Sequence, residues 1–205
     1  IMKVKQMSLS GTNWEKSLAA INIDANLFLL FVSPEFNFKE EVLNSLNVKY
    51  PKATIIGCST AGEISDVTVN DASISLTAVQ LDKVKIKKVS VTIKDMNSSK
   101  AAGEEIALQL NAKDLKHVIV LGDGLYVNGA DLVTGLKSEM PNISITGGLA
   151  ADGFNFNRTF VINGDEIVDK TIVGLGFYGE GLKVGYSSKG GWNTFGIERL
   201  VTKSD

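Results

Sequence analysis

The order of apolar runs and amphipathic segments along the chain predicts two βαβ units. An apolar run at 26–32 is followed by helical spacing at 37–46 and by a second apolar run at 53–56. A strand, a helix and a strand within about 30 residues are typical of a right-handed crossover between parallel strands. The same order recurs at 118–146, where Asn128 is placed to cap the intervening helix.

Three antiparallel hairpins are predicted around these units. In the first, residues 73–81 alternate between apolar and polar, and the alternation of 84–93 changes parity at Lys87-Lys88, which favours a β-bulge near Lys87. In the second, 159–168 surrounds the turn Asn163-Gly164-Asp165. The third joins residues 171–178 to Leu182–Ser187.

The remaining elements complete a mixed α/β fold class. Residues 2–7 read as an edge strand and 99–110 as a helix, and further helices follow two capping-box patterns, Thr12 with Glu15 and Asn37 with Glu40. Parallel strands from the βαβ units and antiparallel hairpins then form one mixed sheet or two stacked sheets. No clean internal repeat is seen.

Composition narrows the class of protein. The chain of 205 residues, 44% hydrophobic, is expected to form one domain over 1–205. The net charge of −2 argues against nucleic acid or an anionic membrane as the main partner. A single cysteine, no apolar run of about 18 residues and no signal peptide favour a cytoplasmic protein without membrane insertion. No metal set or phosphate-binding loop is found, so no cofactor is expected.

Three strand ends rich in glycine and polar residues carry the candidate chemistry. They lie at 57–63, 122–129 and 147–153, and the carboxyl ends of parallel strands meet at one sheet edge. The polar side chains that would converge there are those of Cys58, Ser59, Thr60, Glu63, Asp123, Asn128 and Asp152. Their hydroxyls, carboxylates and free N–H groups suit a small polar ligand, and an amino acid would fit well. The alternative is a set of ordinary turns in which Asp123 and Asn128 only cap.

Two other function classes remain open. Cys58 could serve as the nucleophile of a hydrolase or transferase, or a carboxylate such as Asp123 or Asp152 could act in catalysis. The single histidine, His117, begins its strand, so it is expected at the edge opposite Cys58, as a partly exposed side chain. The third class is an interaction module whose loops serve a partner domain.

Three motifs resemble the FIST N-terminal sensory domain over about residues 10 to 203. They are Gly57-Cys58-Ser59-Thr60-Ala61-Gly62-Glu63-Ile64, then Gly147-Gly148-Leu149-Ala150-Ala151-Asp152-Gly153 followed by Phe156, Thr159 and Asn163-Gly164, and finally Gly191-Trp192-Asn193-Thr194-Phe195-Gly196.

The resemblance implies a bacterial or archaeal input domain of signal transduction, which binds a small ligand and passes its state to an output module. It also implies a following C-terminal FIST domain, which is expected to be missing from this chain because it would begin near Thr202. The motif positions carried over are Cys58, Ser59, Thr60, Glu63, Gly147, Gly148, Asp152 and Trp192.

Overall fold

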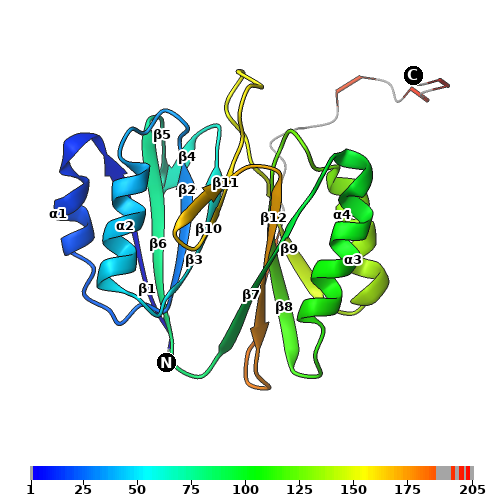
Figure 1. Cartoon of the computed structure of the whole chain (residues 1–205), viewed down its shortest axis with the longest axis horizontal. Helices are drawn as coiled ribbons and strands as arrows, with labels where there is room; N and C mark the ends of the chain where they lie inside the picture. The colour runs from blue at the N-terminus through cyan, green and yellow to red at the C-terminus, as the bar shows by residue number, and fades with distance from the viewer. Residues whose placement is uncertain (1, 188–194, 197–198, 201, 204–205) are drawn as a thin grey trace.

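The chain folds into four layers, in which two β-sheets face each other and a pair of helices covers the outer side of each (Figure 1). The structure is a computed structural model that describes residues 2–187, 195–196, 199–200 and 202–203. The parallel pairs and antiparallel pairs confirm the mixed fold class, and they lie in two stacked sheets.

The first sheet has six strands in the order β1-β6-β2-β3-β10-β11. Their bounds are Met2–Ser10, Ser73–Leu81, Leu27–Val32, Thr54–Ser59, Val161–Asn163 and Glu166–Val168. Helices α1 (Trp14–Ala19) and α2 (Lys39–Lys49) pack on its outer face. The βαβ prediction is confirmed, because β2 and β3 are parallel and α2 connects them.

The second sheet has four strands in the order β7-β12-β8-β9. Their bounds are Lys85–Thr92, Thr171–Tyr178, Leu115–Gly122 and Ser144–Leu149. Helices α3 (Ser99–Leu110) and α4 (Gly129–Glu139) cover it, and β8 runs parallel to β9 as predicted. A small hairpin of β4 (Glu63–Ser65) and β5 (Thr68–Asn70) stands apart, and 3-10 turns at Gly11–Asn13 and Met96–Ser98 precede α1 and α3.

Apolar residues form a core between each helical layer and its sheet, and a third core between the two sheets. In the third core, Ile56 of β3 and Leu27 of β2 pack with side chains of the opposite sheet such as Val173. Both faces of the central strands β2 and β8 are therefore buried, which explains their long apolar runs.

The two halves of the chain repeat one topology, which extends the recurring βαβ order seen in the sequence to the neighbouring strands. In the first parallel pair Leu27 is opposite Thr54, and in the second His117 is opposite Ser144, an offset of 90 residues for both strands. Helices α2 and α4 keep the same offset, and the strand order β1-β6-β2-β3 matches β7-β12-β8-β9. The halves share few identical residues, so the period is weak in the sequence.

The first predicted hairpin is wrong, because β6 and β7 lie in different sheets. The register between β7 and β12 runs unbroken from Lys85 to Thr92, so there is no bulge near Lys87. The parity changes because Ile86 faces the core between the sheets, whereas Val89 and Val91 face the helices. Strand β7 thus buries its inter-sheet face near its start and its helix-facing side near its end.

The second predicted hairpin is confirmed as β10 and β11. The third predicted hairpin and the two capping boxes are not formed. Leu182–Ser187 forms no strand, since β12 already has β7 on one side and β8 on the other. Neither capping box forms: the N-caps of α1 and α2 are Asn13 and Phe38, without side-chain capping bonds.

Candidate functional site

The loop after β3 holds a buried carboxylate in a fixed position. Glu63 is 1% exposed, and its two oxygens accept hydrogen bonds from Thr60 Oγ1 at 2.7 Å and Ser73 Oγ at 3.0 Å. Burial of a carboxylate requires such partners. The sequence therefore places Thr60, Glu63 and Ser73 together through a tight turn and the adjacent strand β6.

The loop after β9 is organised around Asp152. Its carboxylate accepts main-chain N–H groups of Phe156 at 3.1 Å, Asn157 at 2.8 Å and Arg158 at 2.9 Å. These hydrogen bonds to the charged form lower the pKa of Asp152. Phe156 takes a positive φ of 46°, and the side chains of Phe154 and Phe156 are 98% and 73% exposed.

A cavity of about 370 Å³, called the acidic pocket below, lies between these two loops and the end of β2. It is lined by Ser33, Pro34, Glu35, Thr60, Ala61, Gly62, Glu63, Asp71, Asp152, Gly153, Phe154 and Asn155. Four of these residues are acidic, and none is Lys or Arg. Among the hydrogen bonds described, none is donated by the main-chain N–H of Ala61, Gly62, Gly153 or Phe154.

Three of the predicted site residues have their polar side-chain atoms in hydrogen bonds within the fold. The buried carboxylate of Asp123 accepts from Leu125 N, Thr159 Oγ1 and Lys170 N at 2.9, 2.5 and 2.6 Å. Ser59 Oγ accepts from Phe160 N at 3.1 Å, and Asn128 Oδ1 caps α4. None of the three lines the cavities described here.

The three strand ends meet, but across two stacked sheets and not at one sheet edge as expected. Ala151 N donates to Ser59 O, which joins the end of β9 to the end of β3 across the two sheets. Thr159 Oγ1 in turn accepts from Gly124 N at 3.0 Å. The loops of both halves are thus held at one end of the molecule, where the acidic pocket lies.

Comparison with known families decides the relationship. The FIST N domain model matches residues 26–205, most of the chain. The chain belongs to the FIST family. This is a family of sensory domains in signal transduction, and the resemblance drawn from the three motifs is confirmed. Comparison with curated proteins finds no match.

The single cysteine of the FIST domain is poorly placed for thiol chemistry. Cys58 is 3% exposed, and burial raises its pKa from 9.0 to about 12. It borders an inter-sheet cavity of about 330 Å³ together with Phe31, Thr60 and Thr146. A thiol that stays protonated near neutral pH is a weak nucleophile.

His117 of the FIST domain is buried, not partly exposed as expected. Its ring lies between the hydroxyls of Ser144 and Thr146, with Nδ1 2.7 Å from Ser144 Oγ and Nε2 2.9 Å from Thr146 Oγ1. Desolvation lowers its pKa. The pattern of hydroxyls at alternate positions of β9 could have indicated this contact.

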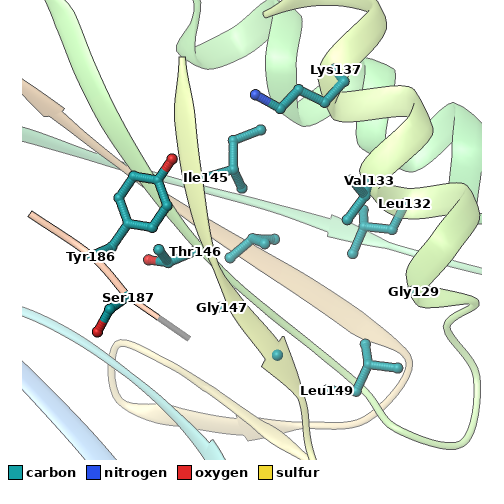
Figure 2. Close-up of a pocket in the computed structure, with 12 residues that line it drawn as sticks. Gly129, Leu132, Val133, Lys137, Ile145, Thr146, Gly147, Leu149, Tyr186 and Ser187 are labelled. Carbon is teal, nitrogen blue, oxygen red and sulfur yellow. The ribbon is translucent and has the colours of Figure 1, made fainter. Parts of the chain in front are cut away.

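The predicted glycines Gly147 and Gly148 border a larger cavity of about 730 Å³, called the edge cavity below (Figure 2). It lies beside β9 and α4, and none of its described lining residues is acidic. Trp192 lies outside the described residues. Within the described ranges, no group of three or more His, Cys, Asp or Glu could hold a metal ion, and no helix is long and apolar enough to cross a membrane.

Proposed function

We propose that this FIST domain senses a small zwitterion, with an amino acid as the leading candidate, in the acidic pocket. The observation that carries the proposal is the combination of carboxylates with main-chain N–H groups that lack a described partner. The sensed state would pass to a C-terminal FIST domain and an output module, the partners that the family resemblance implies.

The two kinds of group suit the two ends of an amino acid. The exposed carboxylates of Glu35 and Asp71 would attract the ligand's ammonium group, because no lysine or arginine lining the pocket neutralises them. The N–H groups of Gly62 and Gly153 would hydrogen-bond the ligand's carboxylate, as main-chain donors do in anion-binding loops.

A ligand in this pocket would connect the two halves of the chain. Thr60 and Glu63 follow β3 of the first half, whereas Asp152 and Gly153 follow β9 of the second. Contacts to both loops give the ligand a way to shift their relative position, and a sensor needs two arrangements that the ligand binds with different affinity.

The enzyme alternative has less support. The protonated thiol of Cys58 would need a base, and His117 is occupied by two hydroxyls. The carboxylate oxygens of Asp123 and Asp152 already accept hydrogen bonds from within the fold. One observation favours the interaction module: Phe154 and Phe156 expose large apolar side chains beside the pocket.

The test is a thermal-shift screen of the whole chain with amino acids, amines and small carboxylates. A ligand at 100 times its Kd stabilises by about 2.7 kcal/mol, and each kcal/mol raises the Tm of a chain this size by roughly 2–4 °C. We expect a saturable rise with an amino acid. Glu35→Gln with Asp71→Asn should remove it, whereas the exposed control Glu40→Gln should keep it. A rise that survives the double substitution would refute the pocket assignment.

A further inference from the structure

Strand β9 ends the second sheet, and no described residue forms strand pairs with its outer side. Ala150 N donates to Gly122 O of β8, and successive residues of a strand point to opposite sides. Thr146 and Gly148 therefore also direct their main-chain groups at β8. The main-chain groups that face the open edge are those of Ile145, Gly147 and Leu149.

The other sheet edges carry features that discourage strand addition. Strand β1 has Lys3 and Lys5, β7 has three lysines, and β11 is only three residues long and begins with Glu166. The sequence of β9, Ser-Ile-Thr-Gly-Gly-Leu, has neither charge nor proline. Natural sheets protect exposed edges with charges, prolines or short strands, so an uncharged open edge marks a pairing surface.

The first half of the chain shows how such an edge is filled. At an offset of 90 residues, β9 corresponds to β3, and β3 pairs on its outer side with the antiparallel strand β10. Ser59 N donates to Phe160 O and Gly164 N to Ile55 O, both at 2.9 Å. The counterparts of Ser59 and Ile55 are Leu149 and Ile145, whose outward main-chain groups have no strand partner among the described residues.

The edge cavity provides room for the side chains of an added strand (Figure 2). Its walls include Leu132, Val133, Ile145 and Leu149, and among the described lining residues only Lys137 is charged. Lys137 Nζ donates to Ile143 O at 2.6 Å, which places the ammonium at the start of β9. Tyr186 and Ser187 border the same cavity, but no described main-chain hydrogen bond joins them to β9.

We propose that β9 binds an extended segment of another protein as an antiparallel strand, with aliphatic side chains over the edge cavity and an acidic residue beside Lys137. Strand addition of this kind draws affinity from main-chain hydrogen bonds and specificity from the flanking pockets. Extending the β10 register by two residues sets Asp165 opposite Thr54, the counterpart of Ser144. The acidic residue therefore belongs near the C-terminal end of the segment, which is the end that meets Lys137.

The probe is a fluorescently labelled peptide with the sequence of residues 159–165, Thr-Phe-Val-Ile-Asn-Gly-Asp, titrated against the whole chain by fluorescence polarisation. Gly164 N faces β3 in the fold, so the amide of Ile162 faces the same way and that of Val161 faces away. We expect saturable binding that weakens about tenfold or more when the amide of the Ile162 position is methylated. Methylation at the Val161 position should leave affinity nearly unchanged.

Variants of the chain test whether the peptide binds at β9. Ile145→Pro removes an edge-facing donor without removing a hydrogen bond to β8, and it should weaken binding about tenfold. Lys137→Glu should also weaken it, because it repels the acidic end. Equal binding by both methylated peptides, equal binding to Ile145→Pro, or no saturation up to about 1 mM would overturn the proposal.

Two related measurements detect other occupants of the β9 edge. A concentration-dependent dimer of the wild-type chain that Ile145→Pro dissolves would identify a second copy as the occupant and overturn the proposal. Slow hydrogen exchange of the Gly147 amide in the free chain would show that the chain fills its own edge, which also overturns it. Rapid exchange that becomes slow on adding the peptide is the supporting result.

Discussion

The carboxylate of Asp152 holds its loop through hydrogen bonds, and the stability that they contribute depends on pH. Asp152→Asn would turn one carboxylate oxygen into an NH2 group that faces a main-chain N–H, that of Phe156 in one amide orientation and those of Asn157 and Arg158 in the other. We expect the free energy of unfolding at pH 7 to fall by roughly 1–3 kcal/mol, the contribution of hydrogen bonds to a charged acceptor. Urea denaturation of both proteins measures this loss.

The pH dependence of this difference tests its electrostatic origin. The folded-state pKa of Asp152 is lowered, so its stabilisation is present above the unfolded pKa of about 3.9 and is lost as the pH falls through the folded value. The gap between wild type and Asp152→Asn should therefore narrow below about pH 4. A gap of constant size from pH 7 to pH 3 would contradict the hydrogen-bonded carboxylate.

The sequence predicted which residue types gather at the strand ends, but not which of them remain available. Thr60, Glu63 and Asp152 do line one pocket. Asp123 looked equivalent, yet its partners Thr159 and Lys170 lie 36 and 47 residues further along the chain. Only the folded structure brings such distant donors together, so a local pattern cannot separate a ligand-binding carboxylate from a structural one.

At the scale of strands, the two halves place a glycine at the same point of their parallel pairs. A Cβ at Gly57 would collide with Leu30 O, and a Cβ at Gly147 would collide with Val120 O, the equivalent position. We expect Gly57→Ala and Gly147→Ala each to lower the free energy of unfolding by roughly 2–4 kcal/mol, because main-chain atoms cannot move aside easily.

Gly148→Ala is the matched control, since a methyl group there would have no atom of the described residues within 4 Å apart from its chain neighbours. It lies in the same motif and strand as Gly147, so it separates the crowding and the positive φ of Gly147 from the general effect of alanine on strand glycines. We expect a change below about 0.5 kcal/mol, measured by chemical denaturation. Equal losses at Gly147 and Gly148 would show that close strand approach is not the reason for the motif.

Most helices and strands were predictable from the sequence, whereas the pairing of the strands was less predictable. The periodicity of 99–110 and the Asn128 cap match α3 and α4. The parity change after Val84 and Ile86 favours a bulge in the sequence, because a period of two residues does not indicate which neighbouring layer covers each face of the strand. Pairing of β7 with β12 depends on residues that follow 79 or more positions later, beyond any local pattern.

At the scale of the molecule, the two halves are interleaved and not merely stacked. The hairpin β10–β11 belongs by sequence to the second half, yet it extends the sheet of the first. The core between the sheets draws Ile56 and Val79 from one half and Leu121 and Val173 from the other. Neither half can bury its inner face alone, so the two halves should lose their structure together.

Calorimetry tests this coupling. We expect one unfolding transition for the whole chain, with an enthalpy near 140 kcal/mol if Tm lies close to 60 °C, from about 0.7 kcal/mol per residue over 205 residues. The van't Hoff enthalpy should agree with the calorimetric value. Two resolved transitions would mean that the halves unfold separately. In that case the core between the sheets and the β10–β11 hairpin would contribute too little free energy to make the two halves unfold together. A ligand held between the two loops would then act by changing how the halves contact each other.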